Sequence, residues 1–181
     1  MVYYLKNNEN GNPACYETAL EITKQGDIVT FKFTANHSER YCAFSGYNKL
    51  HCFGDACEIF IGNDDDRKTY YEIEISPKNE LMLAKMIYVG ERENGEPIIK
   101  IQFIKDCFLK SSVELIENGY IATITLNLND IKTGDNEVYF NAYRLETDGG
   151  EKEKHLFALS PTMARRFHRP DYYLYLKDYI E

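Results

Sequence analysis

The sequence predicts an all-β protein, an antiparallel β-sandwich with little helix. Three observations support this fold class. Short segments in which apolar and polar residues alternate recur along the chain, and turn signals rich in glycine, asparagine and proline separate them. No segment keeps the 3.6-residue period of a long amphipathic helix. Short strands at this spacing are typical of two sheets packed face to face.

The first clearly predicted strand covers residues 28–35. Its apolar face includes Val29, Phe31 and Phe33, and its opposite face carries Lys32. This is the period of two that a half-buried strand requires, because successive side chains point to opposite sides of a sheet.

Residues 58–61 and 69–76 are predicted to form a hairpin, closed by a loop over residues 62–68. In the returning strand one face is apolar and the other carries glutamates. The loop contains three consecutive aspartates: Asp64, Asp65 and Asp66. We interpret it first as a solvated turn, since aspartate and asparagine bond readily to nearby backbone. A calcium site at these three aspartates is the alternative, because hard cations prefer carboxylate oxygens, although the EF-hand spacing is absent.

Three later segments also alternate in the manner of strands: residues 98–103, 120–129 and 138–145. Residues 128–134 and 162–168 have the composition for a turn or two of helix. No repeat or linker divides the sequence. We therefore expect residues 1–181 to form a single domain.

Charge and cysteine content narrow the classes of function. A net charge of -8 and a pI near 5.1 argue against general binding to nucleic acid or to an anionic membrane, both of which need a surplus of positive charge. The five cysteines are odd in number and lack a Cys-x-x-Cys pair. This favours free thiols in a reducing compartment. With no secretory signal pattern at the N-terminus, the expected location is the cytoplasm.

Four segments together resemble one known family: "GDACEIFIGN", "YYEIEISP", "FNAYRLE" and "ALSPTMARRFHRPDYYLYL". In this order they are similar to family 9 carbohydrate-binding modules and their relatives in the DOMON-like superfamily, from about Tyr41 to Leu176. The resemblance implies a β-sandwich that binds an oligosaccharide or polysaccharide chain end and does not cleave it. Such modules stack the apolar faces of a sugar on aromatic rings and bond its hydroxyls with polar side chains.

The resemblance also implies which residues contact the sugar. The sugar-binding glutamate of the family corresponds to Glu58. The polar positions of its late strand correspond to Asn141, Tyr143 and Arg144. Together with Glu72 and the aromatic residues Phe53 and Phe157, they form our predicted ligand-binding set.

The sequence departs from the family at its stacking residues. The tryptophans expected six residues before the glutamate and next to the Ser-Pro segment are replaced by Cys52 and Leu159, and the chain contains no tryptophan. Phe53, Phe157 and Tyr143 are candidates to supply substitute rings.

Two further features concern charged side chains on strands. Glu72 and Glu74 are two residues apart and point the same way, with Glu58 across the hairpin, so the three imitate the paired carboxylates of a glycosidase. A solvated strand face is the main interpretation, and no residue is identified as acid or base, so we expect no enzyme. Arg144 lies on an otherwise apolar face and must meet either a ligand or a paired carboxylate, for which Glu58 and Asp55 are candidates.

Other ligands remain as alternatives to a sugar. A DOMON-type protein could bind haem through a methionine and a histidine, and Met82 and Met86 offer the sulfur ligands, although core packing is their main interpretation. The chain could also be a protein-interaction module with a degenerate sugar site. No cofactor other than calcium is expected, and the oligomeric state does not follow from the sequence.

Overall fold

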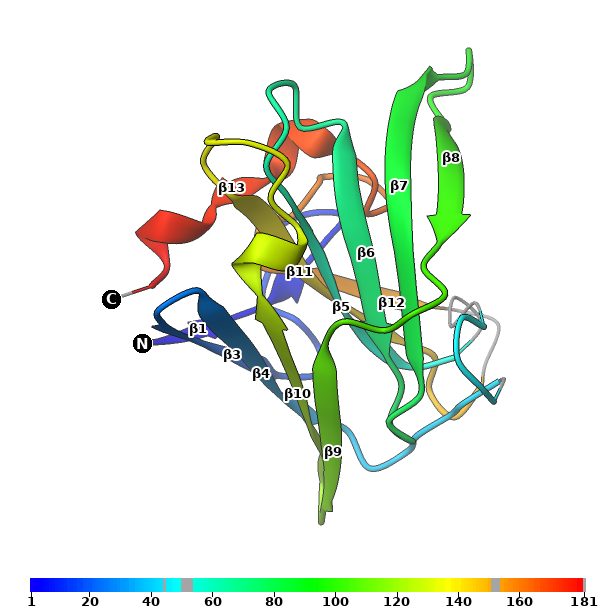
Figure 1. Ribbon diagram of the computed structural model, residues 1–181. Coiled ribbons are helices and arrows are strands. Elements are labelled where there is room, and N and C mark those ends of the chain that lie inside the picture. The colour runs from blue at the N-terminus through cyan, green and yellow to red at the C-terminus, as the bar shows by residue number, and fades with distance from the viewer. Residues whose placement is uncertain (44, 50–53, 151–153, 181) are drawn as a thin grey trace.

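Two antiparallel β-sheets pack face to face in the computed structural model, which describes residues 1–43, 45–49, 54–150 and 154–180 (Figure 1). Within this part, the smaller sheet has the strand order β1-β3-β4-β10-β9. Its strands are β1 (Val2–Tyr4), β3 (Thr18–Gln25), β4 (Ile28–Asn36), β9 (Lys110–Ile116) and β10 (Gly119–Asn127). The predicted sandwich is confirmed.

The larger sheet has the order β2-β12-β11-β5-β6-β7-β8, and β13 pairs with β11 at its far end. Its strands are β2 (Lys6–Asn7), β5 (Ala56–Gly62), β6 (Thr69–Ile75), β7 (Leu81–Glu91), β8 (Pro97–Phe103), β11 (Tyr139–Glu146), β12 (His155–Ala158) and β13 (Leu174–Tyr175). The predicted hairpin is therefore β5–β6, and its loop connects the strands as expected.

Helix in the described residues is limited to single 3-10 turns at Leu128–Asp130, Pro170–Tyr172 and Leu176–Asp178. The first falls inside the predicted helical segment 128–134. The second predicted segment, 162–168, forms no helix and is held as an irregular loop. None of the helical turns in the described residues has the length or apolar character to span a membrane.

The main core fills the space between the two sheets. Val29, Phe31 and Phe33 of β4 are fully buried in it, as their alternation predicts. Ile59 and Ile73 face them from β5 and β6 of the larger sheet. Burial of these alternate side chains is the main force that brings the two sheets together.

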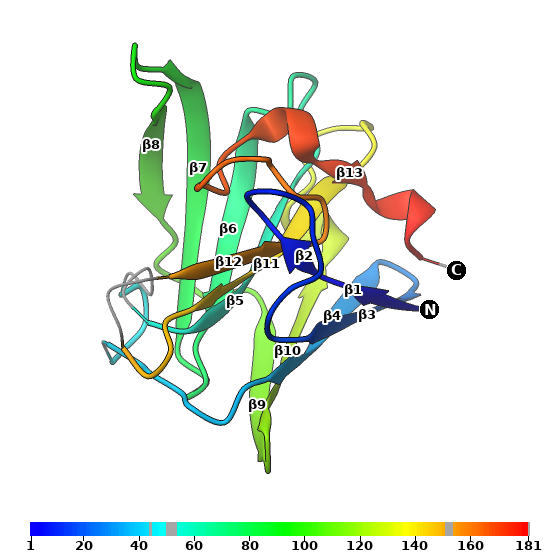
Figure 2. The ribbon, with the colours of Figure 1, turned by 180° about the vertical axis from the view of Figure 1, so that it is seen from behind.

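A second apolar cluster covers the outer face of the larger sheet. Phe60 and Tyr70 of the β5–β6 hairpin pack there against Phe167 and Tyr173, which follow β12 in the sequence. Figure 2 shows this late segment crossing the outside of the larger sheet. The larger sheet is therefore covered on both faces over part of its area, whereas alternation predicted one solvated face.

Two buried methionines and the free cysteines agree with the sequence predictions. Met82 and Met86 are buried in the second cluster, as expected of core residues. The cysteines of the described residues are free thiols, as predicted: Cys15, Cys42, Cys57 and Cys107.

We expect Phe33→Ala to reduce the free energy of unfolding by about 3–5 kcal/mol, because it opens a cavity in the main core. Leu115→Ala on the exposed part of β9 is the control and should change it by less than about 0.5 kcal/mol. Urea unfolding measures both values. Equal losses in the two variants would contradict the assignment of the core.

Candidate functional site

Three glutamates meet on the outer face of the larger sheet. Glu58 of β5 lies directly opposite Glu74 of β6, and Glu72 is two residues earlier on the same strand. One carboxylate oxygen from each lies within 4.8 Å of the others. All three residues are at most 5% exposed. The sequence prediction that they point the same way is confirmed, but the expectation that they are solvated is wrong.

A hollow of about 250 Å³ lies over these carboxylates. Its lining has an acidic floor, an apolar wall and basic groups toward solvent. The lining residues are Glu58, Glu72, Glu74, Leu145, Lys154, Leu156, Arg165, Arg166, Phe167 and His168. A concave site with a few convergent polar groups on apolar walls is the usual form of a small-molecule site.

The loop that forms one side of the hollow is fastened by a buried asparagine near the N-terminus. The Asn8 side chain donates to Oγ1 of Thr162 at 2.8 Å and to the carbonyl of Ala164 at 2.7 Å, and it accepts from the Thr162 amide at 2.9 Å. The Thr162 hydroxyl in turn donates to the Arg166 carbonyl at 2.6 Å. Residues 162–168 form these bonds in place of the predicted helix. The bonds hold residues 165–168 over the sheet.

Burial dominates the electrostatics of the floor. It raises the pKa of Glu58 well above the usual range, the charge of Glu74 raises it further, and Lys154 opposes this increase. Burial also lowers the pKa of His168 to about 4, so this imidazole is neutral near pH 7. His168 shares a 2.8 Å hydrogen bond with the Tyr70 hydroxyl, and its Nε2 lies 3.9 Å from Glu72.

Two predicted ligand contacts on β11 turn out to be packing residues. The Asn141 side chain is buried and bonded to the Tyr143 hydroxyl at 2.9 Å and to the Ser160 carbonyl at 2.8 Å. The Tyr143 hydroxyl donates to the Phe167 carbonyl at 3.1 Å, and the two rings stack at 4.3 Å. Both side chains point to the outer face of the larger sheet, where the hollow lies. They bond to the segment that covers this face and are fully buried, so neither can contact a ligand.

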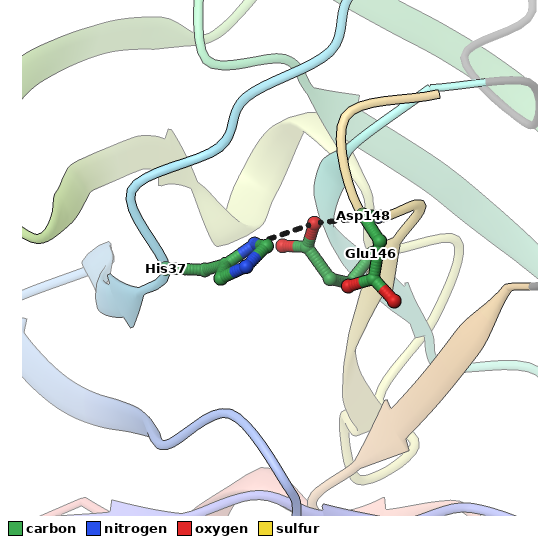
Figure 3. Close-up of side chains that lie close together, drawn as sticks. All are labelled: His37, Glu146 and Asp148. Atoms are coloured by element: carbon green, nitrogen blue, oxygen red, sulfur yellow. Dashed lines mark hydrogen bonds and ion pairs between the residues drawn. The ribbon is translucent and has the colours of Figure 1, made fainter. Parts of the chain in front are cut away.

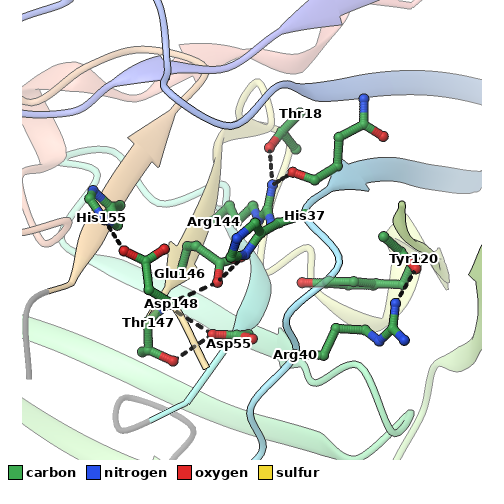
Figure 4. Close-up of polar contacts among 12 residues, drawn as sticks. Thr18, His37, Arg40, Asp55, Tyr120, Arg144, Glu146, Thr147, Asp148 and His155 are labelled. Atoms are coloured by element: carbon green, nitrogen blue, oxygen red, sulfur yellow. Dashed lines mark hydrogen bonds and ion pairs between the residues drawn. The ribbon is translucent and has the colours of Figure 1, made fainter. Parts of the chain in front are cut away.

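The prediction that Arg144 contacts a ligand is also wrong, since its side chain is fully buried between the sheets. Figure 4 shows its polar contacts. Its guanidinium pairs with Glu146 on its own strand and donates to Oγ1 of Thr18 at 3.0 Å. The paired carboxylate is therefore neither Glu58, which lies on the other face, nor Asp55. A buried arginine needs such partners because its charge has lost water.

Asp55 has a separate structural role beside this ion pair. Its carboxylate accepts from the Tyr41 amide at 2.6 Å and from the amide and hydroxyl of Thr147 at 2.9 and 2.7 Å. It thereby ties the segment before β5 to the turn after β11. Asp55 belongs to the family-like segment "GDACEIFIGN". Its hydrogen bonds give it a structural role in the fold.

His37, Glu146 and Asp148 form a second group of metal-ligand types in the described residues (Figure 3). His37 lies 3.1 Å from Glu146, and Asp148 is bonded to His155 at 2.7 Å. The Tyr16 ring stacks on His37 at 4.0 Å. Because Glu146 already neutralises Arg144, we interpret this group as the closing part of the buried ion-pair network.

The aspartate loop does not gather its side chains around one point. Asp64 accepts from the Tyr139 hydroxyl and from the Thr69 amide, and Asp66 accepts from the Lys68 amide at 3.1 Å. These bonds fit the solvated-turn interpretation. Asp64, Asp65 and Asp66 are absent from the metal-ligand groups that the described residues form, so the calcium alternative gains no support.

The aromatic residues predicted to replace the missing tryptophans do not line the hollow in the part of the chain that the structure describes. Phe157 is fully buried in the main core and cannot present its ring to a ligand, which corrects that prediction. Phe53 lies outside the described residues. Phe167 instead supplies an aromatic edge to the hollow. Phe167 lies in the family-like segment "ALSPTMARRFHRPDYYLYL", but its position beside Glu58 depends on the tertiary fold.

Comparisons with known proteins support the fold. No family model matches the chain, and no curated protein matches it by sequence. Among solved structures, a protein from Bacteroides uniformis, provisionally described as carbohydrate-binding, matches with a TM-score of 0.73 at 16% identity, over 96% of this chain and 84% of that one.

Two structures of a family 9 carbohydrate-binding module from Caldicellulosiruptor kristjanssonii also match, each over 96% of this chain. The complex with cellotriose has a TM-score of 0.62 at 10% identity and is covered over 79% of its length. The complex with glucose has a TM-score of 0.61 at 12% identity and is covered over 82%. The chain therefore has the fold of these modules.

We expect Glu146→Gln to lower the free energy of unfolding by about 3–5 kcal/mol, because it leaves the buried charge of Arg144 without its carboxylate. Glu21→Gln is the matched control, since Glu21 pairs with Lys32 in a half-exposed position, and it should cost less than about 1 kcal/mol. Chemical denaturation compares the two. A small loss for Glu146→Gln would show that the network is not a structural requirement.

Glu58→Gln should stabilise the protein increasingly as the pH rises. The folded-state pKa of Glu58 is above its unfolded value, so the stability that this group contributes at low pH is lost as the pH rises through the folded pKa. The stability difference between variant and wild type should grow by up to about 1.4 kcal/mol per pH unit in that window. Using this difference cancels the opposite effect of His168, whose lowered pKa favours the folded state at higher pH.

Urea unfolding of both proteins from acidic to mildly alkaline pH measures this difference. A difference that stays constant across the series would mean that Glu58 titrates like a solvated glutamate.

Proposed function

We propose that this chain, which has the fold of family 9 carbohydrate-binding modules, binds the end of an oligosaccharide or polysaccharide chain without cleaving it. The sugar occupies the hollow above Glu58, Glu72 and Glu74. The single observation that carries the proposal is the meeting of these buried carboxylates at the floor of a hollow in this fold.

The hollow offers the two kinds of contact that a sugar needs. Carboxylates of the floor accept hydrogen bonds from hydroxyl groups, and such charge-assisted bonds are stronger than neutral ones. Lys154 and Arg165 at the margin donate to hydroxyl oxygens. Leu145, Leu156 and Phe167 provide apolar surface for the C–H face of a pyranose.

The absence of tryptophan changes the balance of these contacts. A module with an indole on each side of the sugar gains much of its affinity from stacking, whereas here Phe167 is 8% exposed and offers little of its ring face. Polar contacts to the floor must therefore supply more of the affinity. We expect binding that depends strongly on the position of hydroxyl groups.

The haem alternative gains no support from the described residues. Met82 and Met86 are buried among aromatic side chains of the second cluster and do not line the hollow. If no sugar binds, we would infer a role in protein interaction instead.

We expect glucose and cellotriose, the ligands of the similar modules, to give saturable heats in calorimetry and to raise the melting temperature. Glu58→Ala should weaken binding by about tenfold to a hundredfold, because it removes a charged hydrogen-bond acceptor. Glu114→Gln on the exposed face of β9 should bind as the wild type does.

A glycan array extends the test to other sugars, and product analysis of cellotriose checks for cleavage. Wild-type affinity in Glu58→Ala would place the site elsewhere. Binding to no sugar would refute the proposed function, and cleavage that Glu58→Ala abolishes would refute its non-catalytic part.

A further inference from the structure

We propose that the hollow selects a sugar that carries a primary ammonium group, such as glucosamine or an oligomer of it. This inference rests on the proposed function and names the class of sugar for the same site. It follows from the three carboxyl groups that Glu58, Glu72 and Glu74 bring together where the ligand must sit.

The floor brings together more carboxyl groups than a neutral sugar needs. Amide or hydroxyl side chains also satisfy the hydroxyl groups of a sugar, and they cost far less to bury than carboxylates. Here three carboxylates come from two adjacent strands to within 4.8 Å of one another. An ammonium group donates three hydrogen bonds and carries the opposite charge, so it matches three converging carboxylates in both number and sign.

Glu58 is the side chain that most needs such a ligand. It is 4% exposed and lines the hollow. Its carboxyl group accepts no hydrogen bond from the part of the chain that the structure describes, and burial and the charge of Glu74 act on it more strongly than the charge of Lys154 does. Buried carboxylates are normally bonded. A donor arriving with the ligand would satisfy this one.

The rest of the lining indicates an organic cation and not a bare metal ion. The hollow of about 250 Å³ has room for more than an ion, and Leu145, Leu156 and Phe167 offer no oxygen ligands to one. They do match the apolar carbon skeleton of a pyranose. The carboxylates then bind the ammonium group while these side chains contact the ring.

Basic side chains surround the acidic floor and orient the ligand. Arg165 is exposed, and Lys154 and Arg166 are half-buried, so their charges lie nearer to solvent than the carboxylates do. Arg166 is also 3.6 Å from Glu91. An ammonium group at this margin would be repelled, whereas hydroxyl oxygens would accept from these donors. The amine should therefore point inward and the hydroxyls outward.

Ligand binding should also release a proton. A cation next to Glu58 favours its ionised form, so the proton that the buried carboxyl holds passes to the buffer. The other charged or titratable groups that face it from the surrounding elements are Glu72, Glu74, Lys154, Arg165, Arg166 and His168. Calorimetry in buffers of different ionisation enthalpy measures this release.

The test compares glucosamine, glucose and N-acetylglucosamine by calorimetry at a slightly acidic pH, where the amine is protonated. N-acetylglucosamine keeps the carbon skeleton but loses the positive charge. We expect glucosamine to bind at least about tenfold more tightly than either neutral sugar, since charged hydrogen bonds exceed neutral ones by this margin. The advantage should fall as salt is added.

The variant Glu58→Gln/Glu74→Gln should bind the three sugars with similar affinity, whereas Glu114→Gln should keep the preference for glucosamine. Circular dichroism and urea unfolding verify that the double variant folds. Loss of the preference in a folded variant that still binds glucose supports the inference.

The other outcomes are distinct. Equal binding of glucose and glucosamine by the wild type overturns the inference and leaves the proposed function standing. Binding of no sugar overturns both. Binding of putrescine as tight as that of glucosamine, or of calcium in place of glucosamine, would show a cation site without sugar recognition and would also overturn it.

Discussion

The covering of the larger sheet's outer face is the constraint on which the candidate site depends. Asn8, Asn141 and Tyr143 each bond to the segment that follows β12 and hold it over the sheet. Without this cover, Glu58 and Glu74 would form an ordinary solvated cross-strand pair. With it, like charges are concentrated away from water, where a positively charged or hydrogen-bonding partner interacts more strongly than at an open surface.

Side chains of β11 point alternately to the inner and the outer face of the larger sheet. This alternation separates the charged residues that stabilise the fold from the side of the sheet that carries the candidate site. Arg144 and Glu146 of β11 face inward and neutralise each other between the sheets. Leu145, which lies between them in sequence, faces outward, toward the side that carries the glutamates. The buried ion pair therefore belongs to the core, and Glu58, Glu72 and Glu74 belong to the hollow. A charged residue on a strand of such a sandwich must be assigned to a face before it is assigned a role.

Much of the fold could be predicted from the sequence, because period-two alternation directly reports which residues share a face. The β5–β6 hairpin and the shared direction of Glu58, Glu72 and Glu74 follow from it. Burial of those glutamates could not be predicted, since it is produced by a segment about 90 residues later. The role taken over from the family for Arg144, and the use of Phe157 as a substitute ring, were wrong for a related reason: both residues lie on the inner face, where the second sheet covers them.

The most direct test of the central claim is an experimental structure of the protein with a bound sugar. The terminal sugar unit should lie in the hollow, with polar atoms within hydrogen-bond distance of Glu58 and its neighbours and the carbon face toward Leu145 and Leu156. A sugar bound on any other surface, with the hollow unchanged and the three carboxylates not in contact with it, would contradict the account.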